Sequence, residues 1–128
     1  MEDNQQAEAS VRWSVTDPLG NKVILIEEQF IEHIIDAHES KDAINRAMIE
    51  RQVRKSIAAP RFIIKDQRNV DRRKYLDLVD VSNEAGTQIK TLAIVVDDNN
   101  EVVTWILKRN INEFVVEGGM IYDAQMVR

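Results

Sequence analysis

The chain has 128 residues, of which 44% are hydrophobic, so it can bury one core, and a single domain is expected over residues 11–128. It contains no cysteine, which excludes a disulfide framework or thiolate metal site and fits a reducing compartment such as the cytoplasm. The net charge of -5 argues against a general nucleic-acid binder. Residues 1–10 are polar and no apolar run approaches the roughly 18 residues of a membrane span, so we expect a disordered N-terminus and no membrane partner.

The charge is unevenly distributed along the chain. Residues 51–74 contain nine Lys and Arg against two Asp and Glu, whereas residues 1–50 contain four against eleven. A solvated helix face followed by a charged loop explains such a run without any ligand, and an anion-binding patch is the alternative. On the second interpretation one positive surface is expected to include Arg51, Arg54, Arg72, Arg73 and Lys74.

The first expected element is a β-hairpin, because VRWSV and KVILI flank the turn sequence TDPLGN. Two helices should follow. The apolar residues recur with a helical period from Glu27 to His38, and a second helix over residues 41–58 should end before Pro60, since a residue before proline avoids the α conformation. The residues expected to face the core are Phe30, Ile31, Ile34, Ile35, Ala37 and His38 in the first helix and Ile44, Met48, Val53 and Ile57 in the second.

Beyond Pro60 the pattern changes to strands, in the segments RFIIKD, KYLDLVDV, IKTLAIVVD and EVVTWILK. The predicted fold class is therefore α+β, with an N-terminal hairpin and two helices packed on a mostly antiparallel sheet. If Val96 lies opposite Glu101, Thr104 points away from the helices. The helix-facing side would then contain Leu92, Ile94, Val96, Val103, Trp105 and Leu107.

Both histidines of the chain lie in the segment EHIIDAHES. His33 and His38 are five residues apart, which separates their rings by roughly 140° around a regular helix, so the pair cannot chelate one ion and no metal or cofactor is expected. His38 falls within the apolar arc, where a ring can bond a carbonyl at a helix end. His33 falls at its edge, either as a surface ring or as a group for proton transfer.

Three segments resemble the phage-associated branch of the barnase, EndoU, colicin and RelE nuclease superfamily. HIIDAH, at residues 33–38, is similar to its H-I-x-x-R-H motif, and AAPRFIIKD, at residues 58–66, to its proline and isoleucine-rich strand. LAIVVDDNNEVVTWI, at residues 92–106, is similar to its final hairpin, which ends in T-A-Y. The resemblance runs from about residue 13 to residue 108 and implies a barnase/RelE-like fold. The sequence departs from the family pattern at Ala37, Glu39 and Ile106.

The resemblance implies RNA cleavage without metal, in which a base removes the 2'-hydroxyl proton and an acid protonates the leaving 5'-oxygen. His33 is the preferred proton-transfer group, and cations or hydroxyl donors would stabilise the phosphoryl oxygens. The candidate catalytic residues are His33, His38, Tyr75, Lys90 and Thr104. The candidate RNA-binding residues are Arg51, Arg54, Arg72, Arg73, Lys74 and Lys108. Tyr75, Lys90 and Thr104 each also have an interpretation as ordinary strand residues.

Three functions stay open. The expected one is a toxin-like or RNA-processing ribonuclease, with RNA as its partner and a protein inhibitor or antitoxin as a candidate second partner. The alternative is a catalytically inactive RNA- or protein-binding module on the same fold. The third is an adaptor whose basic segment contacts an acidic protein. Cleavage distinguishes the first from the second, and salt-dependent RNA affinity separates both from the third.

Overall fold

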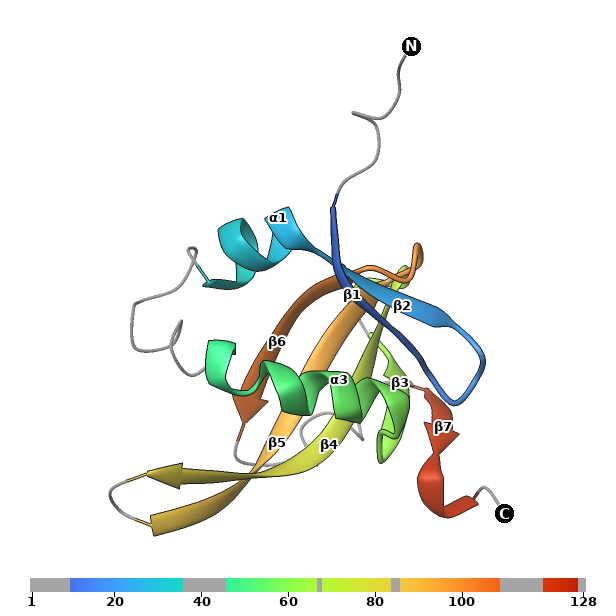
Figure 1. The fold of residues 1–128 in the computed structure, drawn as a ribbon. Coiled ribbons are helices and arrows are strands. Elements are labelled where there is room, and N and C mark those ends of the chain that lie inside the picture. The colour runs from blue at the N-terminus through green and yellow to red at the C-terminus, as the bar shows by residue number, and fades with distance from the viewer. Residues whose placement is uncertain (1–9, 36–45, 67, 84–85, 109–118, 127–128) are drawn as a thin grey trace.

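The computed structural model describes residues 10–35, 46–66, 68–83, 86–108 and 119–126. They form an α+β fold, in which a β-hairpin and short helices lie on one side of a five-stranded sheet (Figure 1). Residues 46–48 form a helical turn ahead of the longest described helix. The elements of this layer are β1 (Val11–Thr16), β2 (Lys22–Ile26), α1 (Glu27–Gln29), the π-helix η2 (Phe30–Ile35) and α3 (Glu50–Ala58).

The sheet has the strand order β6-β5-β4-β3-β7, and every neighbouring pair is antiparallel. The antiparallel pairing predicted for the segments IKTLAIVVD and EVVTWILK is confirmed. The strand at Met120–Asp123 lies beyond EVVTWILK, the last segment for which the sequence predicted a strand. The elements are β3 (Phe62–Lys65), β4 (Arg72–Asn83), β5 (Gly86–Asp97), β6 (Val102–Lys108), β7 (Met120–Asp123) and the 3-10 helix η3 (Ala124–Met126).

The predicted turn between β1 and β2 is confirmed, and Asp17 organises it. One carboxylate oxygen, Oδ1, accepts the backbone N–H groups of Leu19 at 2.9 Å and Asn21 at 2.8 Å. Gly20 has φ +90°, a left-handed conformation that glycine adopts without steric cost. The TDPLGN sequence therefore forms the tight reversal that its proline and glycine indicated.

The main core lies between the sheet and the layer of hairpin and helices. A β-bulge between Val95 and Val96 places Val96 opposite Val102, so Val102 enters the core and the prediction for Val103 is wrong. The backbone carbonyl of Val103 instead accepts a hydrogen bond from Gln29 at 2.7 Å. The rest of the predicted face is confirmed: Leu92, Ile94, Val96, Trp105 and Leu107. A smaller cluster on the reverse face contains Ile64, Leu76 and Ala93, with Phe62 and Ile106 packed against it.

Some of the helix residues that were predicted to face the core are buried, and others are exposed. Phe30, Ile34, Val53 and Ile57 are in the core as expected. The structure does not describe the side chains of the other predicted core residues, which are Ile35, Ala37, His38 and Ile44. Ile31 is 48% exposed and Met48 is 75% exposed, so these two predictions are wrong. The helical path breaks at Ile49, which has φ -94° and ψ 3°, and Ile49 packs on the core in place of Met48. None of the helices in the described ranges is long and apolar enough to cross a bilayer.

Candidate nucleic-acid interface

The exposed side of α3 carries three cations. Arg51, Arg54 and Lys55 are all exposed, while Val53 and Ile57 are buried against the core. Spacings of three and four residues place the three cations on neighbouring positions of one helix face. Over the ranges that the structure describes, none of them forms an ion pair with a carboxylate. We call Arg51, Arg54 and Lys55 the basic ridge.

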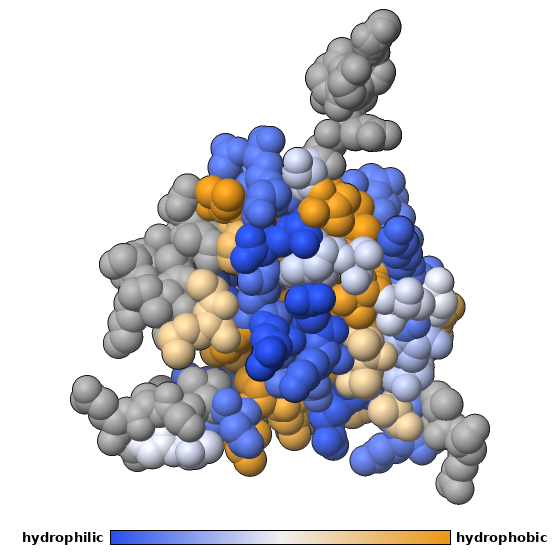
Figure 2. Space-filling model, viewed as in Figure 1, coloured by the Kyte–Doolittle hydropathy of each residue, from blue (hydrophilic) through white to orange (hydrophobic). Residues whose placement is uncertain are grey.

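Two open depressions meet at the basic ridge, and hydrophilic residues dominate the middle of this face (Figure 2). The first, of about 350 Å³, is called the basic pocket and is lined by Val15, Arg51, Arg54, Lys55 and Ala58. The second, of about 370 Å³, is called the central pocket and is lined by Arg12, Trp13, Glu27, Glu50, Arg51 and Arg54. Because both are open to solvent, they suit contact with the surface of an extended ligand.

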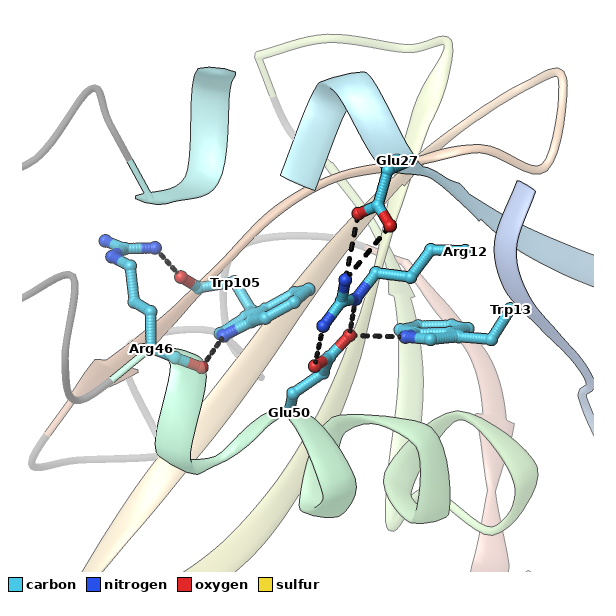
Figure 3. A network of polar contacts seen from close by, with 6 residues as sticks. All are labelled: Arg12, Trp13, Glu27, Arg46, Glu50 and Trp105. Carbon is cyan, nitrogen blue, oxygen red and sulfur yellow. Dashed lines mark hydrogen bonds and ion pairs between the residues drawn. The ribbon is translucent and has the colours of Figure 1, made fainter. Parts of the chain in front are cut away.

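Arg12 of β1, an exposed residue that lines the central pocket, lies at the centre of a polar network (Figure 3). Its Nη2 donates to Glu50 Oε1 of α3 at 2.9 Å, and its Nη1 donates to Glu27 Oε2 of α1 at 2.8 Å. The guanidinium also lies 3.9 Å from the centroid of the Phe30 ring, a cation–π contact. Trp13 Nε1 donates to Glu50 Oε2 at 2.7 Å. This network, called the Arg12 clamp, joins β1, α1, η2 and α3.

The Arg12 clamp holds its groups in their charged forms. The hydrogen bond to Glu50 is the largest cause of a raised pKa at Arg12, and the bond to Glu27 adds to it. Burial alone would raise the pKa of Glu50, but the hydrogen bonds from Arg12 and Trp13 outweigh burial and hold it below its usual value. The guanidinium of Arg12 is therefore committed to internal partners.

Contacts of α3 with β1 and β6 position the basic ridge. The guanidinium carbon of Arg54 lies 5.9 Å from the centroid of the Trp13 ring, whose indole nitrogen is fixed by Glu50. On the other side of the helical layer, Trp105 Nε1 donates to the backbone carbonyl of Arg46 at 3.2 Å, and Arg46 Nη1 donates to the carbonyl of Trp105. Reciprocal bonds to the edge strand β6 thus hold the turn that leads into α3.

A second polar network, called the hairpin latch, joins the buried residues Asp17 and Tyr75 to the half-buried residues Arg73 and Asn100. The hydroxyl of Tyr75 donates to Asp17 Oδ2 and accepts from Arg73 Nε at 2.9 Å, while Arg73 Nη2 donates to Asn100 Oδ1 at 2.6 Å. Burial and the bond to Asp17 raise the pKa of Tyr75. Burial would raise the pKa of Asp17, but the bonds from Tyr75 and Asn21 hold it below its usual value. The latch fixes the β1–β2 turn to the sheet.

Of the five candidate catalytic residues, the structure describes four, and it does not bring those four together. His33 is exposed on η2, and His38 lies outside the described residues. Tyr75 is fully buried in the hairpin latch, which is a structural role. Lys90 is half-buried opposite Val79, and Thr104 lies on the far face of β6, where it accepts a hydrogen bond from Arg46 at 3.2 Å. The far-face position predicted for Thr104 is confirmed.

The single positive surface expected from residues 51–74 is divided. Arg51 and Arg54 lie together on the basic ridge. Arg73 points to the helix-facing side of the sheet and is bound within the hairpin latch. Its neighbours Arg72 and Lys74 point to the reverse face, because successive residues of a strand alternate. Lys108 is exposed opposite Thr91, on that same reverse face.

Sequence reasoning missed Lys55 and the whole Arg12 clamp. Lys55 was detectable, because it lies four residues after Arg51 on the predicted helix. The clamp had no local signal, because Arg12 and Glu50 are 38 positions apart and meet only in the folded chain. Within the described segments, no three His, Cys, Asp or Glu side chains are grouped closely enough to hold a metal ion.

Comparison with protein-family models, with curated proteins and with solved structures finds no match to this chain. The basic ridge, the two pockets and the positions of the candidate residues are therefore the features that bear on function.

Proposed function

We propose that this chain binds RNA and that the basic ridge of α3 contacts the phosphate backbone. The observation that carries the proposal is the exposure of three adjacent cations that, in the described part of the chain, have no carboxylate partner. Arg and Lys side chains bind phosphate oxygens through charge-assisted hydrogen bonds. The resemblance of three segments to a nuclease superfamily supports RNA as the source of those phosphates.

The arrangement around the ridge fits a polyanion better than a small enclosed ligand. The basic pocket and the central pocket are open and share Arg51 and Arg54, so one ligand can run along both. A ligand that runs along both pockets lies against the exposed side of α3, where the three cations of the basic ridge are found. Binding would therefore be oriented, with the α3 side of the molecule toward the RNA.

Charge reversal tests the RNA proposal. The variant Arg51→Glu/Arg54→Glu is compared with Lys65→Glu/Arg68→Glu, which makes the same change in net charge at exposed positions outside both pockets. The affinity for a fluorescently labelled single-stranded RNA should fall by about a hundredfold or more in the first variant, because two charge-assisted contacts become repulsive. Equal losses in the two variants, or none in either, would contradict the proposal.

A second candidate function is metal-independent RNA cleavage, as the resemblance implies. The observation in its favour is that His33 is exposed, so its imidazole can reach a bound substrate. Histidine exchanges protons near neutral pH, and removal of a general acid or base lowers a rate by about a hundredfold or more. The test is incubation of RNA with the protein in EDTA, beside His33→Ala and His38→Ala variants. A wild-type chain that binds RNA but leaves it intact would rule cleavage out and retain the binding module.

A further inference from the structure

The helical segment that precedes α3 carries the opposite charge. Glu28 and Glu32 are exposed on α1 and η2, and between them Ile31 is 48% exposed. They border an open depression of about 330 Å³, called the acidic groove, which is lined by Ser10, Glu27, Glu28, Ile31 and Glu32. The Arg12 clamp neutralises Glu27, so the charges directed to solvent are those of Glu28 and Glu32.

The acidic groove and the basic ridge are the two ends of one track on the surface. The acidic groove and the central pocket share Glu27, and the central pocket and the basic pocket share Arg51 and Arg54. The α1–η2 segment and α3 lie on the same side of the sheet, with Arg12 between Glu27 and Glu50 (Figures 1 and 3). The track therefore runs from negative to positive across the Arg12 clamp.

We infer that this track is a self-association surface, in which the acidic groove of one chain receives the basic ridge of a second copy. A two-fold axis through the Arg12 clamp exchanges the ends of the track, so each groove meets the partner's ridge and the interface closes after two copies.

Apolar side chains that line the two ends of the track suit the same occupant. Ile31 lies within the acidic groove, and Val15 and Ala58 lie within the basic pocket. Apolar contact among acidic and basic residues is the usual anatomy of a specific interface, in which charge complementarity sets the register. A second copy supplies both the cations and the apolar side chains, so no other partner is required.

Charge-swapped chains test the inference in the absence of RNA. Chain one carries Arg51→Glu/Arg54→Glu and chain two carries Glu28→Lys/Glu32→Lys, both at exposed positions where the fold should be retained, as circular dichroism can verify. Sedimentation velocity at low salt should show that the wild-type protein self-associates and that each swapped chain alone does so about a hundredfold more weakly. An equimolar mixture of the two chains should recover association, since each groove then faces a ridge of opposite charge.

Three results would overturn the inference. They are a wild-type chain that stays monomeric into the millimolar range, a swapped chain that associates like the wild type, and a mixture that forms no complex. The outcome is independent of the proposed RNA function, because chain two keeps the basic ridge intact. If chain two loses self-association and still binds RNA, the two activities proposed for the basic ridge are distinguished. If neither chain binds RNA while the mixture associates, only the RNA proposal fails.

Discussion

The Arg12 clamp and the basic ridge lie beside one another and use their charges in opposite ways. Glu50 and Arg51 are consecutive residues of α3, yet Glu50 is bonded to Arg12 and Trp13, whereas Arg51 is exposed and has no carboxylate partner in the described ranges. Arg12 has three internal contacts, with Glu27, Glu50 and the Phe30 ring. A count of charges along the sequence cannot separate these cases. We therefore expect the Arg12 clamp to contribute stability, whereas the proposed RNA binding would use the basic ridge.

The largest expected effect compares two arginines. Arg12→Met removes the shared partner of two carboxylates and should lower the free energy of unfolding by about 1 to 2 kcal/mol, with the folded variant keeping its RNA affinity. Arg51→Met should change the free energy of unfolding by less than about 0.5 kcal/mol and weaken RNA binding about tenfold. Urea denaturation and fluorescence anisotropy measure the two quantities. If both variants change the same quantity, clamp and ridge are not distinct.

The next effect is the pH dependence of the clamp. Because the folded-state pKa of Glu50 lies below its ordinary value of 4.5, its contribution to stability is complete above that value and is lost as the pH falls through the folded-state pKa. The buried carboxylate of Asp17 has a lowered pKa as well and acts in the same direction. Urea denaturation from pH 7 to pH 3 should show a smaller acid loss of stability for Glu50→Gln than for the wild type. Identical profiles would contradict the role given to Glu50.

The smallest effect concerns the indole that joins the two regions. Trp13→Phe removes the hydrogen bond to Glu50 but keeps an aromatic ring near Arg54, so it should cost about 1 kcal/mol of stability. RNA affinity should change by no more than about twofold, since no cation is lost. Thermal denaturation and RNA titration of this variant measure both. A loss of RNA affinity as large as that of Arg51→Met would place Trp13 in the binding surface itself.

The sequence predicted most of the sheet because alternation of apolar residues along a strand is a local signal. The hairpin at TDPLGN and the core side of β5 were found in this way. The errors come from irregular backbone. Because of the bulge at Val95 and Val96, Val102 lies in the core where Val103 was predicted. Because the helical path breaks at Ile49, Met48 is exposed. Neither feature has a period that a sequence pattern can reveal.

The candidate site was harder to predict, because the role of each charged residue depends on partners that are distant in the sequence. Arg51 and Arg54 were predicted from their place in a charged helix, and the structure brings them together. Arg73 has the same side chain and lies in the same basic segment, but its contacts with Tyr75 and Asn100 tie it to the hairpin latch. Tyr75, chosen for its hydroxyl, is buried for the same reason. Only their long-range contacts distinguish Arg51 and Arg54, which are exposed on the basic ridge, from Arg73, which is bound in the hairpin latch.

The salt dependence of RNA affinity is the most direct test of the claim that the basic ridge binds phosphate. Each neutralised phosphate of a single strand contributes about 0.7 to the slope of the logarithm of the binding constant against the logarithm of salt concentration. The variant Arg51→Gln/Arg54→Gln/Lys55→Gln should therefore bind more weakly and show a slope shallower by about 2 than that of the wild-type chain. A slope equal to that of the wild type would show that the ridge makes no phosphate contacts and would contradict the account.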